Sequence, residues 1–413
     1  MKKILSFLFL GTNLVALAQL QVSVLEITTN DLVYDAVTNK IFASIPSSNG
    51  SNGNSLGIID PNTNLLVGTV FIGSEPSVLA ISDNGQYIYS GFNGTSTVRR
   101  FDVATRTAGI QFTLGTDNST GSYYAEDIEV MPGQPTTIAV SRRNIGYSPR
   151  HEGVAIYDDN IMRPITTQDH TGSNKIEFTG QNSLIGYNNE STEYGIRRLA
   201  VNSGGVSNVS VTQSALNGFS LNFIYRNNYM YATNGSVIDI SATPFVSGQF
   251  SNVNGPVAYD TFSNRVCFAS SDFSGNIVFQ RFNPNTFLLQ DMLPISQAFG
   301  SAKSIIACGS GCYAFNTTDN KVIIIKDPSL LAVADVDKHN KLNVFPNPAT
   351  DNVTIESDLD INSIEISDVN GRLIYNTGLN GNSINLSGLQ NGLYLIRITA
   401  ADGSTFTKKI VKK

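Results

Sequence analysis

A short β-rich segment recurs along most of this chain at intervals of 37 to 50 residues. A repeat of roughly 40 to 50 residues that contains several short strands is typical of the blades of a β-propeller. The period therefore predicts an all-β fold with a seven-bladed β-propeller, and an open array of sheets or an irregular sandwich is the alternative. The segments centre on Phe42, Tyr89, Ala139, Ile185, Tyr231, Phe268 and Tyr313.

The second repeat shows the pattern inside one unit. The turn Asp83-Asn84-Gly85 suits a hairpin because glycine tolerates positive φ. Stretches rich in β-branched and aromatic residues lie before and after this turn, and two more follow. Each unit is therefore expected to be a sheet of four strands. In the second repeat these strands are residues 77–81, 86–90, 97–102 and 109–114.

The seventh repeat, residues 303–327, holds only three strands, whereas a spare strand at residues 22–27 precedes the first full repeat. A propeller whose first and last blades pair leaves no raw sheet edge at the junction. We therefore predict that residues 22–27 complete the last blade and that the propeller spans residues 19–329.

The N-terminus has the features of an export signal. Residues 1–3 are Met-Lys-Lys, residues 4–10 are mostly apolar, and Ala16-Leu17-Ala18 forms a cleavage site. A membrane anchor, the alternative, needs about twenty apolar residues, and the polar residues 11–13 interrupt this run. We expect a signal peptide at residues 1–18 and no transmembrane span in the mature chain.

Charge and cysteine content limit the function further. The formal net charge of −6 argues against nucleic-acid binding, which needs a basic surface. Cys308 and Cys312 flank Gly309-Ser310-Gly311, so a tight hairpin would place the two thiols opposite each other. A disulfide between them and a set of three free, half-buried thiols that includes Cys267 are both considered.

One group of loops is rich in side chains that bind ligands. Residues 141–152 lie between the second and third strands of the third repeat, and residues 123–127 and 187–194 lie in neighbouring loops. In a propeller such loops gather on one face around the central channel. The candidate ligand-binding residues are Glu126, Arg142, Arg143, Tyr147, Arg150, His151, Tyr187 and Glu190.

These loops leave the activity open. Bidentate arginine contacts and tyrosine stacking suit a glycan, a carboxylate ligand or a protein, so a binding or scaffold module is the leading hypothesis. A hydrolase or lyase for a sugar acid or lactone is the second, and it requires Arg142, Arg150, His151 and Glu126 to converge. A structural surface-layer protein is the third.

The same loops also fit a solvated surface with arginine–glutamate pairs, each contributing about 0–1 kcal/mol. The sequence lacks the repeated motifs of propeller enzymes, a nucleophile elbow, a His-Glu-x-x-His site and a phosphate loop. No catalytic residue, cofactor or metal ligand is therefore assigned.

Several segments resemble a known family. Residues 67–76, residues 81–89 and Phe101-Asp102-Val103-Ala104-Thr105 resemble the YVTN-type β-propeller repeats of bacterial surface proteins. The resemblance implies a propeller fold and a surface or extracellular setting, and it implies no activity.

After a linker at residues 330–341, residues 342–413 suit a small C-terminal immunoglobulin-like β-sandwich. This segment resembles the type A sorting domain of the type IX secretion system of Bacteroidota. The resemblance implies passage through the Sec pathway and the outer membrane, the secretion machinery as partner, and a secreted or outer-membrane surface location. A generic accessory module is the alternative. The sorting-signal residues are Pro346, Asn347, Pro348, Gly371, Gly392, Tyr394, Lys408 and Lys409.

Overall fold

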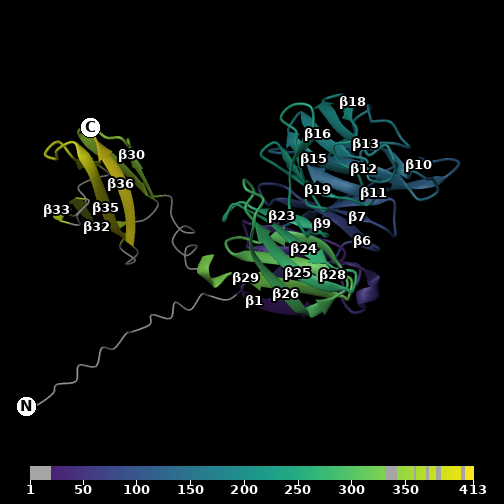
Figure 1. Ribbon diagram of the computed structural model, residues 1–413, viewed down its shortest axis with the longest axis horizontal. Helices are drawn as coiled ribbons and strands as arrows, with labels where there is room; N and C mark the ends of the chain where they lie inside the picture. The colour runs from purple at the N-terminus through teal and green to yellow at the C-terminus, as the bar shows by residue number, and fades with distance from the viewer. Residues whose placement is uncertain (1–19, 331–341, 358–359, 369–371, 378–382, 401–404) are drawn as a thin grey trace, which may run out of the picture. The chain divides into compact units, whose positions relative to one another are not determined.

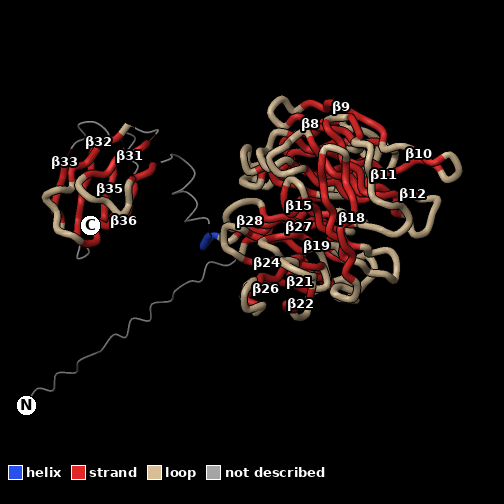
Figure 2. Tube along the Cα trace, turned by 90° about the horizontal axis from the view of Figure 1, so that it is seen from above, coloured by secondary structure: helices blue, strands red, loops and turns tan. Residues whose placement is uncertain are grey.

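The computed structural model describes residues 20–330, 342–357, 360–368, 372–377, 383–400 and 405–413. Its contacts divide the chain after Leu331 into two compact units. Strands form nearly all the regular structure of both units, and loops join the strands at their ends (Figures 1 and 2). The signal peptide expected at residues 1–18 lies outside the described residues.

The first unit contains seven antiparallel sheets, which are named blades 1 to 7 in chain order. A short 3₁₀ helix, η1 (Ser47–Asn49), lies between the second and third strands of blade 1. Blade 1 contains β2 (Leu32–Asp35), β3 (Lys40–Ile45), β4 (Ser55–Asp60) and β5 (Leu65–Phe71). Blade 2 contains β6 (Pro76–Ile81), β7 (Tyr87–Phe92), β8 (Thr97–Asp102) and β9 (Thr107–Thr113).

Blade 3 has five strands rather than the expected four, because the two-residue strand β10 adds to its innermost edge. The strands of this blade are counted from β11, so that β12 is its second strand. Blade 3 contains β10 (Thr116–Asp117), β11 (Gly121–Val130), β12 (Thr137–Asn144), β13 (His151–Asp158) and β14 (Ile161–Met162). Blade 4 contains β15 (Lys175–Gly180), β16 (Ser183–Tyr187), β17 (Ile196–Asn202) and β18 (Gly205–Thr212).

The next two blades return to the four-stranded pattern. Blade 5 contains β19 (Phe223–Arg226), β20 (Tyr229–Ala232), β21 (Ser236–Asp239) and β22 (Phe245–Gln249). Blade 6 contains β23 (Val257–Asp260), β24 (Arg265–Ser271), β25 (Asn276–Phe282) and β26 (Leu289–Phe299).

Blade 7 joins the two ends of the propeller. It contains β27 (Ala302–Ala307), β28 (Cys312–Thr317) and β29 (Lys321–Lys326), and β1 (Gln21–Glu26) is its outer strand. β1 pairs antiparallel with β29, from Gln21 opposite Lys326 to Glu26 opposite Lys321. The prediction that the N-terminal strand completes the last blade is confirmed, and the strand begins one residue earlier than expected.

The repeat seen in the sequence corresponds to one strand of each blade. All seven β-rich centres, from Phe42 in β3 to Tyr313 in β28, lie in the second strand of their blades. These strands have a partner on each side and are buried along most of their length. The second strand therefore carries the clearest apolar signal, and the predicted seven-bladed fold is confirmed.

Apolar side chains fill each interface between neighbouring blades. Seven clusters lie between consecutive blades, and one of them joins Ile324 of blade 7 to Ile41 of blade 1. The innermost strands also contact one another in order around the ring, including β27 with β2. Each sheet is therefore buried on both faces, and the ring is closed.

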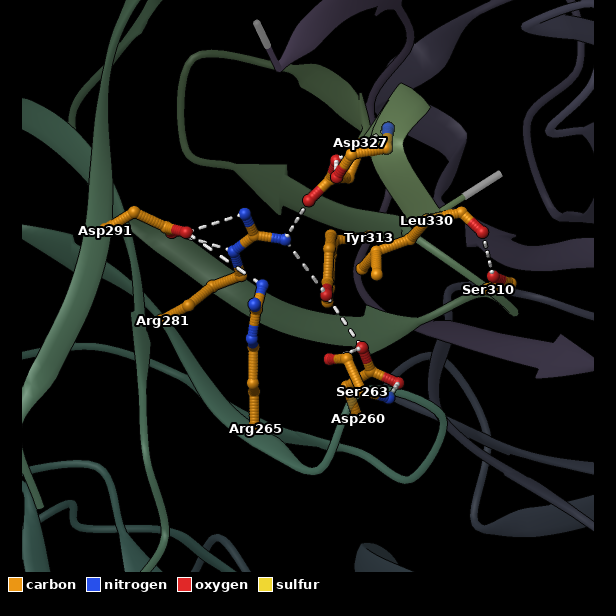
Figure 3. A network of polar contacts seen from close by, with 10 residues as sticks. Asp260, Ser263, Arg265, Arg281, Asp291, Ser310, Tyr313, Asp327 and Leu330 are labelled. Carbon is orange, nitrogen blue, oxygen red and sulfur yellow. Dashed lines mark hydrogen bonds and ion pairs between the residues drawn. The ribbon is translucent and has the colours of Figure 1, made fainter. Parts of the chain in front are cut away.

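A buried polar network ties blade 7 to blade 6 where the chain leaves the propeller (Figure 3). The Nε and Nη2 atoms of Arg281 donate to the two carboxylate oxygens of Asp291, each at 2.7 Å. Its Nη1 donates to Asp327 Oδ2, also at 2.7 Å. The Tyr313 hydroxyl donates to Asp260 Oδ2 at 2.7 Å. Arg281 is 3% exposed and Asp327 4% exposed, so this ion pair has little access to solvent.

The tight turn of blade 7 is closed covalently. Cys308 and Cys312 form a disulfide across Gly309-Ser310-Gly311, and Cys267 is a free, buried thiol. Next to this turn the Ser310 hydroxyl donates to the carbonyl of Leu330 at 2.9 Å. The last described residues of the first unit are therefore fixed to blade 7.

The second unit is a two-sheet domain. One sheet has the order β30-β31-β34 and the other β33-β32-β35-β36, and isoleucines of both sheets share one core. The strands are β30 (Leu342–Phe345), β31 (Asn352–Ser357), β32 (Ile361–Asp368), β33 (Leu373–Thr377), β34 (Ser383–Asn385), β35 (Gly392–Ala400) and β36 (Thr405–Lys412). Helices long and apolar enough to cross a membrane are absent from the described part of the chain.

We predict that Arg281→Met lowers the free energy of unfolding by about 3–5 kcal/mol, because it leaves the buried Asp327 carboxylate without its partner. Urea unfolding followed by tyrosine fluorescence measures the effect, since the chain has no tryptophan. The matched control is Arg265→Met, which removes a more distant contact to Asp291 at 3.9 Å and is expected to cost about 1 kcal/mol or less. Equal losses in the two variants would contradict the prediction.

Candidate functional site

The upper face of the propeller is defined here as the end that carries two kinds of loop. One kind joins the second and third strands of a blade, and the other joins one blade to the next. The alternating strand directions place both kinds at the same end. Two regions of this face differ in chemistry: charged side chains cover blades 3 and 4, and uncharged polar groups cover blades 5 to 7.

The charged side chains over blades 3 and 4 are paired with one another. Arg143 Nη1 lies 3.1 Å from Glu126 Oε2, and Lys175 Nζ lies 3.7 Å from Glu126 Oε1. The guanidinium of Arg150 forms an ion pair with Glu190, and the Arg150 amide donates to the same carboxylate at 2.9 Å. The four sequence-predicted residues form two ion pairs on the upper face, Arg143 with Glu126 and Arg150 with Glu190, and the buried Nε of Arg143 has no partner among the described residues.

Two other predicted residues are buried. His151 is 1% exposed, and its ring packs against Gly172, where a Cβ atom would lie only 2.1 Å away. Burial, together with the charges of nearby arginines, lowers the pKa of His151 to about 3, so it is a poor base near neutral pH. Tyr187 is fully buried and donates its hydroxyl to the carbonyl of Gly218 at 2.9 Å.

The last two predicted residues, Arg142 and Tyr147, contact other neighbours. The guanidinium carbon of Arg142 lies 5.3 Å from the ring centre of Tyr123, and its Nη1 approaches Met162 Sδ at 3.8 Å. Tyr147 is half-exposed, and its ring meets His170 edge-on at 6.4 Å. The four side chains that a reaction would need to converge are each held by a different neighbour, so the geometry gives no support to a catalytic centre here.

A groove with a volume of about 1240 Å³ opens over blades 5, 6 and 7. Its walls come from residues 219–222, 252–256 and 301–305, which precede or begin the innermost strands of these blades, and from residues 270–273. The last segment begins the loop between the second and third strands of blade 6. All four segments belong to the upper face, so the groove lies at the same end as the charged loops.

Polar groups of the groove keep hydrogen-bonding capacity. The side chains of Asn252, Asn254, Ser271 and Ser301 line the groove and have no hydrogen-bond partner among the residues that the structure describes. Gln280 is 6% exposed and donates Nε2 to the carbonyl of Asn252 at 3.2 Å. Its Oε1 is buried and has no partner within the described chain. The groove therefore presents four polar side chains without partners among the described residues, whereas Gln280 Oε1 is not accessible from it.

Exposed apolar side chains flank these polar groups. Phe273, at the tip of the blade 6 loop, is fully exposed, and Phe219 and Met292 are more than half exposed. Phe219 packs edge-on against Tyr194 of the blade 4 loop, with ring centres 5.1 Å apart. The loop that follows Tyr187 therefore supports the groove wall, although Tyr187 itself, at the end of β16, does not reach the surface.

Sequence reasoning missed this groove. Its lining includes only two ionisable side chains, Asp272 and Lys303, so no cluster of charged or catalytic residue types marks it. The available signals were the run Ser270-Ser271-Asp272-Phe273 and the nearby Asn252-Val253-Asn254. Neither differs from an ordinary polar turn until the fold brings the two together.

Carboxylates near the ring axis connect the innermost strands. Asp31 Oδ2 accepts the amide of Leu79 at 2.9 Å, and Asp127 Oδ2 accepts the amide of Ile176 at 2.9 Å. Glu177 accepts the amide of Tyr225 in the next blade. Each carboxylate thus satisfies an amide on the free edge of a neighbouring innermost strand.

Burial has a strong effect on these carboxyl groups, although their side chains keep some contact with solvent. Burial raises the pKa of Asp127 to about 6, against the lowering effect of the Lys175 charge. Burial and the nearby Asp127 charge raise the pKa of Glu177 to about 8. Burial alone would lower the pKa of Lys175, but the Asp127 and Glu126 charges outweigh it and raise that pKa.

Metal binding finds no support among the described residues, because no three His, Cys, Asp or Glu side chains lie together in a suitable group. The carboxylates of Asp60 and Asp272 are used within their own turns. Asp60 Oδ1 accepts the amide of Asn62 at 2.8 Å, and Asp272 Oδ1 accepts the amide of Asn276 at 2.9 Å.

The sorting-signal residues meet at the C-terminal strand of the second unit. Pro346 and Pro348 have no backbone N–H that could donate a hydrogen bond. Asn347, which lies between them, makes hydrogen bonds with its side chain instead. Asn347 Nδ2 donates to the carbonyl of Lys409 at 2.7 Å, and Asn347 Oδ1 accepts the amide of Val411 at 3.0 Å. Asn347 therefore holds the edge strand β36 in place.

Other predicted signal residues lie on the same sheet. Gly392 begins β35, and Tyr394 in that strand donates its hydroxyl to the carbonyl of Gln390 at 2.8 Å. Lys408 and Lys409 are exposed on β36. Gly371 lies outside the described residues.

We predict that Glu177→Gln stabilises the protein at pH 8 and above by about 1–3 kcal/mol, since each unit of pKa difference corresponds to about 1.4 kcal/mol and solvent screens part of it. The raised pKa means that the folded state binds more protons than the unfolded state between about pH 4.5 and 8, so wild-type stability falls as pH rises through this window. The amide oxygen of glutamine still accepts the Tyr225 N–H.

Urea unfolding at a series of pH values tests this prediction. The variant is expected to match the wild type near pH 4 and to lose less stability as the pH rises. Glu26→Gln, at an exposed position of β1, is the control and is expected to leave the profile unchanged. A wild-type pH profile in Glu177→Gln would show that the ionised carboxylate carries no cost in the folded protein.

We predict that Asn347→Asp loosens β36 and lowers the stability of the second unit by about 1–3 kcal/mol, because an oxygen replaces the donor that faces the Lys409 carbonyl. Hydrogen exchange of the β36 amides, including Val411, measures the effect. Asn352→Asp makes the same charge change at an exposed residue of β31 and is expected to leave exchange unchanged. Equal protection in the two variants would contradict the prediction.

Comparison with known proteins gives one family match and several matches in fold. No curated protein matches the chain. Residues 343–413 match the family described as the secretion system C-terminal sorting domain. This match covers the two-sheet second unit and includes every sorting-signal residue named above.

The propeller is similar to solved propellers of low sequence identity. The β-propeller domain of Cps50 (Swd1) from Myceliophteria thermophila has a TM-score of 0.57 and 11% identity, over 74% of this chain and 98% of that chain. The hydrazine synthase of Kuenenia stuttgartiensis has a TM-score of 0.55 and 13% identity, over 78% and 99%. The WD40 repeats of RRP9 have a TM-score of 0.54 and 13% identity, over 75% and 99%.

At these identities the likeness shows the fold alone. The residues of the groove and of the charged loops therefore have no assigned counterpart in those proteins. The chain is a seven-bladed β-propeller that resembles WD40 propellers, followed by a C-terminal sorting domain of the type IX secretion system, which implies export to the cell surface or the surroundings.

Proposed function

We propose that this protein is an exported binding module whose sorting domain brings the propeller to the cell surface or the medium. The groove over blades 5 to 7 then holds a ligand outside the cell. The observation that carries the proposal is the groove itself, which combines a volume of about 1240 Å³ with polar side chains that lack partners among the described residues. Concave sites with a few placed polar groups are the usual form of a binding site.

Binding is favoured over catalysis by the chemistry of the groove. Its lining contains amides, hydroxyls and apolar side chains, with Asp272 and Lys303 as its ionisable members. Both are engaged, Asp272 within its own loop and Lys303 with the carbonyl of Thr29. General acid–base chemistry needs a titratable group within reach of the substrate. The buried His151 and the paired arginines over blades 3 and 4 do not supply one.

The proposal includes finer assignments that the sequence supports. Residues 1–18 act as the signal peptide, residues 19–329 as the propeller, residues 330–341 as a linker and residues 342–413 as a type A sorting domain. The blades are of the YVTN type found in bacterial surface proteins, and the source is a member of the Bacteroidota. The repeated turn in which an aspartate accepts amides two or three residues later, as at Asp35 and Asp260, supports a common blade type.

We predict that Ser301→Trp blocks binding, because Ser301 is an exposed groove residue whose hydroxyl has no partner among the described residues. The labelled mature chain is applied to an array that carries neutral glycans, acidic glycans and peptides. The array signals seen with the wild-type protein are expected to fall at least roughly tenfold with the variant. A tenfold loss of affinity corresponds to about 1.4 kcal/mol of binding free energy.

Ser210→Trp is the matched control, since Ser210 is exposed on the outer strand β18 and away from the groove. Its signals are expected to equal those of the wild type. Binding that survives Ser301→Trp, or that falls equally in Ser210→Trp, would contradict the role of the groove.

A further inference from the structure

We propose that the groove over blades 5 to 7 binds an uncharged oligosaccharide. This inference rests on the proposed binding function and specifies its ligand. It depends on three properties of the lining: the absence of a net charge, the kind of hydrogen-bonding groups, and an exposed aromatic side chain at the rim.

The two ionisable side chains of the lining are already engaged. Asp272 Oδ1 accepts the amides of Ser274 and Asn276 at 2.8 and 2.9 Å, and its Oδ2 accepts the Asn276 side-chain amide at 2.8 Å. Lys303 Nζ donates to the carbonyl of Thr29. The lining therefore carries one charge of each sign and no net charge, so it does not favour an acidic or a basic ligand over a neutral one.

The remaining polar groups match the chemistry of sugar hydroxyls. A hydroxyl both donates and accepts, and the amides of Asn252 and Asn254 and the hydroxyls of Ser271 and Ser301 do the same. None of these four side chains has a partner elsewhere in the described chain. Several neutral donors and acceptors along one groove suit a ligand with hydroxyls on every unit.

Phe273 gives the groove an apolar surface for a sugar ring. It is fully exposed at the tip of the loop between β24 and β25 and makes no ring contact with another described aromatic residue. A large exposed apolar side chain beside a polar groove is typical of a binding site. The C–H face of a pyranose ring is apolar and can cover a phenyl ring, while the sugar hydroxyls reach the amides beside it.

Size and position favour an oligosaccharide over a single sugar or a peptide. The groove volume of about 1240 Å³ exceeds the range of roughly 300–1,000 Å³ that holds drug-sized ligands, so several sugar units fit. Peptides that bind by strand addition need an exposed sheet edge. Three of the four wall segments, 219–222, 252–256 and 270–273, lie mainly in loops and present side chains at the ends of strands, and the fourth, 301–305, runs along the innermost strand β27.

Calorimetric titration of the mature chain tests the ligand class. The probes are neutral hexasaccharides of glucose, mannose, xylose and N-acetylglucosamine, an acidic hexasaccharide of galacturonic acid, and a library of decapeptides. At least one neutral hexasaccharide is expected to bind, with an affinity that stays within roughly twofold between low and high salt because no charge pairs form.

Variants of the rim provide the second measurement. Phe273→Ala is expected to weaken binding of the neutral sugar by roughly tenfold or more, and Phe273→Tyr is expected to keep it. Phe262→Ala is the matched control, because Phe262 is an exposed phenylalanine at the opposite end of the same blade, in the turn between β23 and β24. It is expected to leave the affinity unchanged.

The outcomes separate this inference from the proposed function. If only the acidic sugar or peptides bind, and Phe273→Ala or Ser301→Trp removes that binding, the groove is a binding site and the neutral-sugar assignment is wrong. If no probe binds, or if binding ignores both groove variants, the assignment and the proposed binding function both fail.

Discussion

The pairing of β1 with β29 is the contact on which the rest of the propeller depends. Without β1, blade 7 would have three strands, and the cluster between blades 6 and 7 would lose its contacts with Val22 and Val24. Each blade is buried between two neighbours, so a gap at one junction exposes apolar faces on both sides of it. The loops of the upper face hold their relative positions only because the ring is closed. The Arg281–Asp327 ion pair fixes the residue that follows β29 to blade 6.

The fold was predictable because its strongest signal is local and repeated. The second strand of each blade has hydrogen-bonded partners on both sides and packs on both faces, so residues such as Phe42 and Tyr313 must be apolar in every repeat. Counting strands was then enough to predict the closure of blade 7. The extra strand β10 was not predicted, because its two residues, Thr116 and Asp117, are too few to show the alternation of apolar and polar residues that marks a strand.

The candidate site was less predictable, because it depends on contacts between distant segments. Arg150 and Glu190 are 40 residues apart in sequence, and only the packing of blade 3 on blade 4 makes them an ion pair. The pairing of β12 with β13 shifts register between Ser141 and Arg143, so His151 does not follow the simple alternation of the strand. Its burial could not be deduced from the surrounding charged residues. The groove needs loops from three blades, and no single loop is distinctive by itself.

The upper face is divided into a charged region and a neutral region because charged and neutral polar groups find hydrogen-bond partners in different ways. Charged side chains in neighbouring loops find opposite charges within the protein, as Glu126 does with Arg143 and Lys175, and a paired group gains little from a ligand. Neutral amides and hydroxyls at loop ends, such as those of Asn254 and Ser271, are cheaper to leave facing water and so keep their capacity. A segment rich in charge therefore attracts attention in a sequence while offering few free contacts in the fold. The groove over blades 5 to 7, whose sequence is plain, keeps neutral hydrogen-bonding groups without partners among the described residues.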